Sequence, residues 1–264
     1  MKIIMKQVTP KVVRRFLGRL GQFMQAGLDS AYAPSRWRFP SVEGSLYTLK
    51  QLGFESRCCI DVGAYHGEWS EMFHSVFPYA QILMVEAQEA KRTRLQEIVR
   101  KIGPNSRFEI ALLGSVDGKD VPFCEMETGS SVLEEASPYP RRYVKKALVS
   151  LDSLLARDVT SGFKGADFLK LDTQGYELEI LRGARIVLRG VRVVLMETSL
   201  IPINRGCPLF AEVIEFMTEN MFRLFDFCSQ IRRRDGILWQ TDLMFIREDC
   251  GIVPGSYLTK ENWG

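Results

Sequence analysis

Short apolar runs alternate along the chain with segments in which apolar residues recur every three or four positions. Runs of the first kind are typical of strands buried on both faces, and the second spacing is typical of amphipathic helices. Strands are therefore expected at residues 58–63, 80–87, 107–114, 167–172, 191–198, 222–227 and 241–248. Helices are expected between most of them, at residues 68–77, 89–102, 177–188 and 210–221.

This alternation predicts an α/β fold. We expect a mostly parallel, seven-stranded sheet with helices on both faces and an antiparallel hairpin at one edge. Residues 115–150 interrupt the alternation with short β-like pieces, so an antiparallel or loop-rich insertion is expected there. We divide the 264 residues into a basic helical or lid segment at 1–45 and one domain at 46–264.

Charge is nearly balanced over the whole chain but not along it. The net charge of +3 gives no support for a nucleic-acid partner. Residues 1–25 carry only basic charges, interleaved with apolar residues, so they form either a peripheral membrane contact or a helix packed on the domain. The chain has no signal-peptide pattern, and its six cysteines form no C-x-x-C pair. We therefore expect free thiols and a cytoplasmic protein.

The first apolar strand leads into a glycine-containing turn, IDVGAYHGEWS, and then directly into a helix. Gly63 and Gly67 allow close approach of a ligand, but their spacing is not the G-x-G-x-x-G of dinucleotide sites. Asp61 in the same turn would repel a diphosphate and can accept hydrogen bonds from an amino group. Glu86 ends the next strand, where an acid can accept hydrogen bonds from ribose hydroxyls. Together these residues predict an adenosine ligand with an amino-acid tail, S-adenosylmethionine (SAM).

Six stretches, in this order, resemble the FkbM family of class I, Rossmann-like methyltransferases: IDVGAYHGEWS, VEAQ, EIALLG, VSLDSLL, FLKLDTQGYELEILRGA and VVLMETS. The resemblance implies a SAM-dependent O-methyltransferase that acts on a hydroxyl of a sugar, glycolipid or natural product. Its partner would be a small-molecule or glycan acceptor, and a homodimer is left open. The cofactor contacts that it implies are Asp61, Gly63, Ala64, Gly67, Glu86, Ala111, Leu112 and Asp172. Tyr65 and Ala87 depart from the usual family residues, and we expect both at the mouth of the cofactor pocket.

Methyl transfer to a hydroxyl requires alignment of the acceptor and removal of its proton. Asp172, at the end of the fourth strand, is the first candidate for the base, although DTQG is also a good turn sequence. Glu197 ends the fifth strand. If these strands are adjacent, one carboxylate acts as the base or the two share a divalent ion such as Mg²⁺. His66, in the glycine turn, is a further candidate base because imidazole titrates near neutrality.

The acceptor pocket is predicted less sharply. Ser130 and Ser131 lie in the insertion and are expected to line it. Glu177 is a candidate acceptor contact, but it falls in the first turn of a helix, where an acid is favourable in any case. Two other functions stay open: a methyltransferase-like binding module without catalysis, and an NAD-dependent oxidoreductase, which the glycine turn disfavours.

Overall fold

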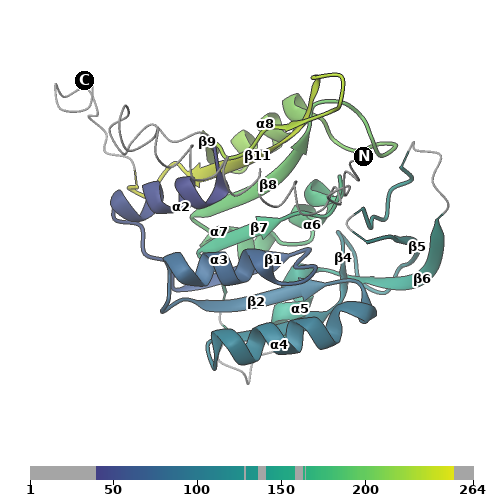
Figure 1. Ribbon diagram of the computed structural model, residues 1–264, viewed down its shortest axis with the longest axis horizontal. Coiled ribbons are helices and arrows are strands. Elements are labelled where there is room, and N and C mark those ends of the chain that lie inside the picture. The colour runs from purple at the N-terminus through teal and green to yellow at the C-terminus, as the bar shows by residue number, and fades with distance from the viewer. Residues whose placement is uncertain (1–39, 128, 136–140, 158–162, 164, 253–264) are drawn as a thin grey trace, which may run out of the picture. The chain divides into compact units, whose positions relative to one another are not determined.

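The computed structural model describes residues 40–127, 129–135, 141–157, 163 and 165–252 (Figure 1). The predicted basic amphipathic helix lies outside the described residues, so its membrane contact stays a prediction. Helix α2 (Val42–Gln51) begins shortly after the first described residue. Among the described helices, none is long and apolar enough to cross a bilayer.

The predicted α/β fold with a mostly parallel sheet is confirmed. In the described part of the chain the main sheet has eight strands in the order β10-β11-β8-β7-β1-β2-β3, with β9 also paired to β11. Its parallel strands are β1 (Cys58–Val62), β2 (Gln81–Glu86), β3 (Ser106–Ile110), β7 (Phe168–Leu171) and β8 (Val193–Ser199). Its antiparallel edge consists of β9 (Phe222–Phe227), β10 (Ile231–Arg232) and β11 (Leu238–Arg247).

The sheet has one strand more than the seven predicted, because the short strand β10 pairs with β11 in addition to β9. Both β9 and β10 pair with β11, but Ser229 lies between them. There the Ser229 hydroxyl accepts a hydrogen bond from the Asp242 main-chain N–H at 2.8 Å, in place of a main-chain partner. A side chain therefore separates β9, which coincides with the strand predicted at residues 222–227, from β10, which is not predicted from the sequence.

Helices cover both faces of the sheet (Figure 1). One face packs against α2, α3 (Glu68–Val76) and α4 (Arg92–Ile102), which follows the short helix η1 (Glu89–Lys91). The other face packs against α5 (Leu151–Ala156), α6 (Glu177–Arg182), α7 (Arg185–Gly190) and α8 (Phe210–Glu219). Neighbouring strand residues alternate between the two cores: Cys59 and Phe168 face the first, and Ile60 and Leu169 face the second. The continuous apolar runs in the sequence arise from this burial on both sides.

The helix predicted at residues 177–188 is observed as two helices, α6 and α7. The break lies at Gly183, where the chain passes directly against the main chain of Gly114. A β-carbon at Gly183 would lie 2.1 Å from the Gly114 carbonyl oxygen. Gly183 therefore allows the close approach of two backbones and ends the helix at that point.

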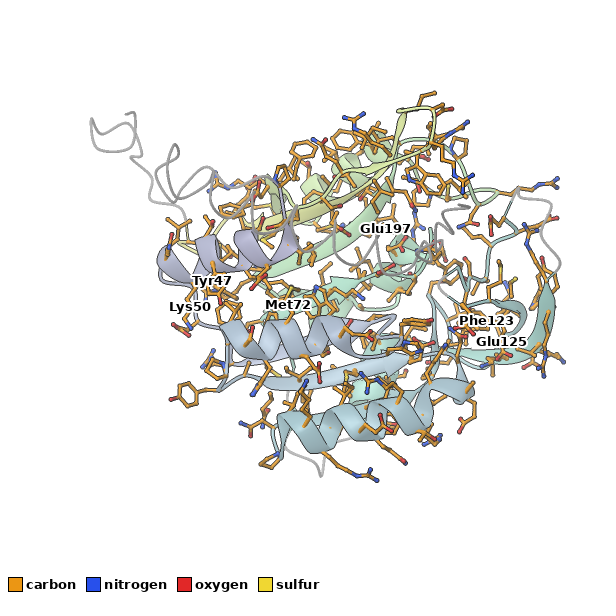
Figure 2. The ribbon with its side chains drawn as sticks, viewed as in Figure 1. Tyr47, Lys50, Met72, Phe123, Glu125 and Glu197 are labelled. Carbon is orange, nitrogen blue, oxygen red and sulfur yellow. The ribbon has the colours of Figure 1, made fainter. Side chains whose placement is uncertain are left out.

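The interruption predicted at residues 115–150 is confirmed as a small separate sheet. It consists of β4 (Leu112–Leu113), β5 (Asp120–Glu125) and β6 (Arg142–Val149), with β5 and β6 antiparallel. Figure 2 places Phe123 and Glu125 on this sheet, at the opposite side of the view from Tyr47 and Lys50 on α2. The chain after β5 folds back through a bridge between Cys124 and Ser131. We call residues 129–135 the return loop.

Candidate active site

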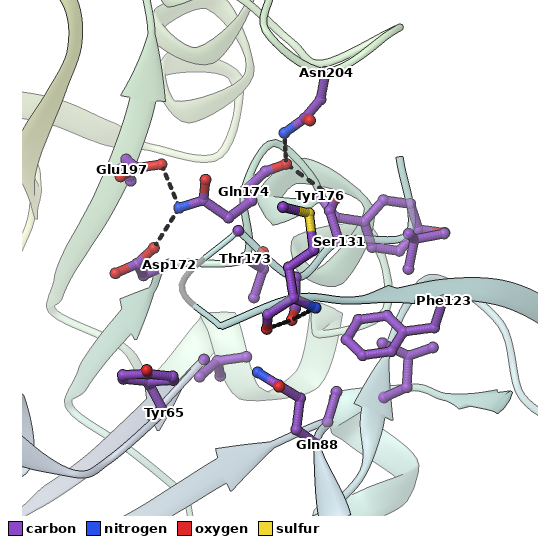
Figure 3. Close-up of a pocket in the computed structure, with 18 of the residues that line it drawn as sticks. Tyr65, Gln88, Phe123, Ser131, Asp172, Thr173, Gln174, Tyr176, Glu197 and Asn204 are labelled. Carbon is purple, nitrogen blue, oxygen red and sulfur yellow. Dashed lines mark hydrogen bonds between the residues drawn. The ribbon is translucent and has the colours of Figure 1, made fainter. Parts of the chain in front are cut away.

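A cavity of about 610 Å³ opens where the parallel strands end (Figure 3). Gly63 lines it from the turn after β1, Glu86 from β2, Asp172 from the end of β7 and Glu197 from β8. The other predicted site residues that line the cavity are Tyr65, Ala87, Ala111, Leu112, Ser130 and Ser131. Ligands in sheets of this kind bind beyond the carboxyl ends of the parallel strands, and most of the predicted residues meet there.

The glycine turn after β1 is shaped by the neighbouring strand and helix. A β-carbon at Gly63, where φ is +73°, would lie 1.9 Å from the Asp172 carbonyl oxygen. At Gly67, where φ is +79°, it would lie 2.8 Å from Cγ1 of Ile98. Of the residues predicted to contact the cofactor in this turn, Ala64 and Gly67 do not line the cavity, and Ala64 is only 4% exposed. Both instead shape the turn through main-chain hydrogen bonds: the Gly67 N–H donates to the Ala64 carbonyl, and the Ala64 N–H donates to the Val85 carbonyl.

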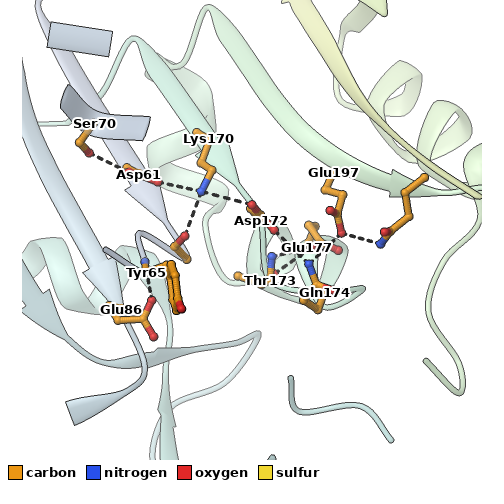
Figure 4. Close-up of polar contacts among 12 residues, drawn as sticks. Asp61, Tyr65, Ser70, Glu86, Lys170, Asp172, Thr173, Gln174, Glu177 and Glu197 are labelled. Atoms are coloured by element: carbon orange, nitrogen blue, oxygen red, sulfur yellow. Dashed lines mark hydrogen bonds and ion pairs between the residues drawn. The ribbon is translucent and has the colours of Figure 1, made fainter. Parts of the chain in front are cut away.

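Asp61 is fully buried beneath this turn and does not line the cavity (Figure 4). One carboxylate oxygen accepts a hydrogen bond from Ser70 Oγ at 2.7 Å, and the other lies 3.0 Å from Lys170 Nζ. Burial lowers the pKa of Lys170, but the charges of Asp61 and Asp172 raise it by more. The ammonium also donates to the Gly63 carbonyl at 2.9 Å. The sequence predicts a ligand contact for Asp61, whereas the structure pairs its carboxylate with Lys170, which holds the glycine turn.

Glu86 presents a carboxylate that the main chain fixes in place. Its Oε2 accepts a hydrogen bond from the Tyr65 N–H and its Oε1 from the Gln88 N–H, both at 2.8 Å. The Ala111 N–H donates to the Glu86 carbonyl at 2.9 Å, which brings Ala111 and Leu112 alongside. A carboxylate has about four acceptor sites, so capacity is left for hydroxyl donors from a ligand in the cavity.

Contacts join three segments at the rim of the cavity: the glycine turn, the short helix η1 and the residues that follow β5. The Tyr65 hydroxyl and Lys91 Nζ both donate to Glu127 Oε2, at 2.8 and 2.9 Å. His66 stacks on Tyr65 with ring centroids 3.7 Å apart, and its Nε2 lies 3.3 Å from Lys91 Nζ. His66 does not line the cavity. The structure therefore gives no support to His66 as a base, because its ring is held outside the wall by Tyr65 and Lys91.

The ends of β7 and β8 bring Asp172 and Glu197 to one side of the cavity, as adjacent strands predict. The side-chain amide of Gln174 lies between them, donating to Asp172 Oδ1 at 3.3 Å and to Glu197 Oε1 at 3.0 Å. Gln240 Nε2 donates to the same Glu197 oxygen at 2.7 Å. Burial raises the pKa of Glu197 well above its usual range, and the negative charge of Asp172 raises it further.

This arrangement does not support the predicted Mg²⁺ site at Asp172 and Glu197. An amide N–H₂ group, which is a donor, occupies the place between the two carboxyl groups where a shared cation would bind. Within the residues that the structure describes, no three His, Cys, Asp or Glu side chains come together in a metal-binding group.

Glu177 is buried beneath the turn that follows β7. Its Oε1 accepts hydrogen bonds from the main-chain N–H groups of Thr173 and Gly175, at 2.7 and 3.2 Å. The side chain is 3% exposed and does not line the cavity. Burial raises its pKa to about 7. The sequence predicts an acceptor contact here, whereas in the structure Glu177 holds the turn, because its carboxyl satisfies donors that would otherwise be buried without partners.

The two predicted serines line the cavity with hydroxyls that are already engaged. Ser130 Oγ accepts a hydrogen bond from the Met126 N–H at 2.8 Å. Ser131 Oγ donates to the Gln174 carbonyl at 3.1 Å, and Asn204 Nδ2 donates to the same oxygen at 2.6 Å. These contacts fix the wall of the cavity and hold the return loop against the turn after β7.

Several lining residues are not predicted from the sequence: Gln174, Tyr176, Asn204, Trp239 and Gln240. Gln240 lies in the polar stretch Gln240–Asp242 near the start of β11, and it is a buried amide. Gln174 lies in the DTQG stretch that sequence analysis treats only as a turn. Asn204 follows β8 in an irregular segment, and no local pattern in the sequence distinguishes it.

A mostly parallel sheet with a glycine turn after its first strand and an acid at the end of its second is typical of Rossmann-like folds, to which the class I methyltransferases belong. The family model of the methyltransferase FkbM domain matches residues 61–224. The chain therefore belongs to the FkbM methyltransferase family and is a methyltransferase of the SAM-dependent kind. No curated protein matches it.

Solved structures with a similar fold share little sequence with this chain. A precorrin-6y C5,15-methyltransferase from Geobacter metallireducens is 14% identical, with a TM-score of 0.45 over 78% of this chain and 88% of that one. A methyltransferase FkbM from Methylobacillus flagellatus is also 14% identical, with a TM-score of 0.45 over 72% of this chain and 43% of that one. The magnesium protoporphyrin IX methyltransferase of Synechocystis, solved with bound SAM, is 13% identical, with a TM-score of 0.45 over 92% of this chain and 86% of that one.

Proposed function

We propose that this protein transfers a methyl group from SAM to a hydroxyl of a small, uncharged acceptor such as a sugar or a hydroxylated natural product. One observation carries the proposal: a single cavity joins the glycine turn and Glu86 to the carboxyl group of Asp172. The first two are suited to an adenosine ligand, and the third is suited to an acceptor hydroxyl.

The residues present fit SAM. Gly63 lets the turn that lines the cavity pack directly against the end of β7, because a β-carbon there would lie 1.9 Å from the Asp172 carbonyl oxygen. The free acceptor capacity of Glu86 suits the two ribose hydroxyls, and Ala111 and Leu112 offer small apolar surface for adenine. When bound, SAM supplies a methyl group on a positively charged sulfur, and the neutral thioether that leaves needs no acid.

Asp172 is the group that we assign to the acceptor proton. Its side chain is 40% exposed. The carboxylate can orient the hydroxyl and accept its proton while the oxygen gains the methyl group. Glu197 is held by two amides and has a raised pKa, so it suits a neutral partner that donates a hydrogen bond to another acceptor oxygen.

The charge of the cavity wall supports an uncharged acceptor. Its described lining includes Glu86, Glu127, Glu135, Asp172 and Glu197 but no lysine or arginine. A phosphate or carboxylate on the acceptor would meet these acids without a cation to pair with. The same wall offers amide groups and aromatic rings, which suit hydroxyl groups and the flat faces of a sugar ring.

The proposal is tested with methyl-labelled SAM and a panel of neutral sugars, glycosides and polyketide alcohols, with sugar phosphates as the comparison. We expect label on neutral acceptors, and we expect Asp172→Asn to lower kcat by about 10²- to 10⁴-fold with little change in SAM affinity. Full turnover in Asp172→Asn would remove this residue from the proton transfer. Calorimetric binding of SAM without methylation of any acceptor would favour a non-catalytic binding module, and binding of NAD instead of SAM would overturn the proposal.

A further inference from the structure

Gln174 joins parts of the site that come from four different segments of the chain. Its side-chain nitrogen donates to Asp172 at the end of β7 and to Glu197 on β8. Its main-chain carbonyl accepts from Ser131 in the return loop and from Asn204 in the segment after β8. Figure 3 shows Gln174 between these two pairs, with the carboxyl groups on one side and Ser131 and Asn204 on the other.

The conformation of Gln174 is held by its surroundings. Its φ of +55° lies in the left-handed region, which non-glycine residues adopt rarely. The next residue, Gly175, also has a positive φ, and Glu177 ties both ends of this turn from below. The turn is therefore fixed by several partners, and the same residue presents its carbonyl to the return loop and its amide to the two carboxyl groups.

The return loop is docked on the same turn. A β-carbon at Gly175 would lie 3.2 Å from Leu133 Cδ1 and 2.6 Å from Cys207 Cβ, so the turn packs directly against the loop and against the segment after β8. The Arg205 N–H donates to the Glu134 carbonyl at 2.7 Å, and Glu135 forms a bridge with Asn204. The loop and this segment therefore meet the turn as one packed unit.

We propose that Gln174 is a positioning residue through which docking of the return loop aligns the carboxyl groups of Asp172 and Glu197. The inference rests on the proposed function, in which these two groups meet the acceptor. The return loop donates a hydrogen bond to the Gln174 carbonyl and so restrains the turn. The restrained turn then places the Gln174 amide within hydrogen-bonding distance of both carboxyl groups. Docking of the return loop and alignment of the Asp172 carboxylate would then occur together.

The test removes the amide and observes the loop. Gln174→Met keeps the length of the side chain and the main-chain carbonyl, so it deletes no atom that touches the return loop. Hydrogen exchange is measured with S-adenosylhomocysteine bound, at the paired amides of Cys124 and Ser131. We expect exchange in the variant to be about tenfold faster than in the wild type, because the turn that carries the loop is loosened. Gln96→Met, the same change at an exposed position of α4, should leave this exchange unchanged.

Kinetics with the panel acceptor that turns over fastest provide the second readout. Gln174→Met should lower kcat about tenfold or more while KM for SAM stays within about twofold, because alignment of the acceptor is lost and the cofactor contacts remain. If Gln174→Met fails to fold, Ser131→Ala replaces it. That variant removes one donor to the Gln174 carbonyl and the acceptor of the Leu133 N–H within the return loop, and it touches neither carboxyl group. It should also lower kcat without raising KM for SAM.

The outcomes separate this inference from the proposed function. If S-adenosylhomocysteine does not bind the wild type, the proposed function fails. If it binds, but loop exchange in folded Gln174→Met equals that of the wild type, only the coupling through Gln174 is overturned. An unchanged kcat in Ser131→Ala also overturns the coupling. Effects of the two substitutions that add independently in the double variant would have the same consequence, because residues in one network are expected to be non-additive.

Discussion

Glu177→Gln is expected to remove a pH dependence from the stability of the fold. The wild-type carboxyl is buried beneath the turn after β7 and accepts hydrogen bonds from Thr173 and Gly175. Glutamine has the same shape and keeps a carbonyl oxygen for these donors, but it does not titrate. The substitution therefore changes the ionisation of the site with little change in its packing.

The magnitude follows from the pKa of Glu177. Burial raises it from 4.5 to about 7, against the opposing effect of the main-chain donors. Between these values the folded state binds the proton more tightly than the unfolded chain, so the free energy of unfolding falls as pH rises through this window. The contribution is fully present below pH 4.5 and lost above pH 7, and it amounts to about 3 kcal/mol.

Urea denaturation at pH 5 and pH 8 measures the effect. We expect the wild type to lose about 2 to 3 kcal/mol more stability over this interval than Glu177→Gln. Glu179→Gln provides the control, because Glu179 lies on the same helix but pairs at the surface with Arg182 and Ser115. This control should keep the wild-type pH dependence. Equal pH dependence in the wild type and Glu177→Gln would refute a buried, titrating Glu177.

Three further predictions concern the glycine turn, Glu86 and the absence of a shared metal ion. Gly63→Ala should cost at least about 2 kcal/mol more stability than Gly53→Ala in denaturation, because both have a positive φ but only Gly63 faces the Asp172 carbonyl. Equal losses would contradict the close approach. Glu86→Gln should weaken SAM binding about tenfold by calorimetry, since one oxygen of a charged acceptor is lost, and an unchanged Kd would argue against a ribose contact. EDTA should leave turnover unchanged, because the Gln174 amide lies where a shared ion would bind, and activity restored only by Mg²⁺ would refute this.

The framework of the site is predictable from the sequence because it follows from local patterns. Apolar runs locate the parallel strands, and ligands in such sheets bind beyond the strand ends. Glu86, Asp172 and Glu197 all line the cavity for this reason. The contacts that complete the site are not predictable in this way, since Gln174 meets Ser131 and Asn204 across 43 and 30 residues of chain. Such pairs depend on how loops pack, and no local pattern in a sequence records that.

The four acids Asp61, Glu86, Asp172 and Glu197, which the sequence places at or near strand ends, differ in the structure because their partners differ. Asp61 has no exposed surface and faces the ammonium of Lys170, so its charge is neutralised within the protein. Glu86 is fixed by two main-chain donors, which suits binding more than proton transfer. Burial and the nearby charge of Asp172 favour the protonated form of Glu197. Asp172 combines a side chain that is 40% exposed with a place on the cavity wall, and for this reason it is the one of the four that we propose as the base for an acceptor hydroxyl.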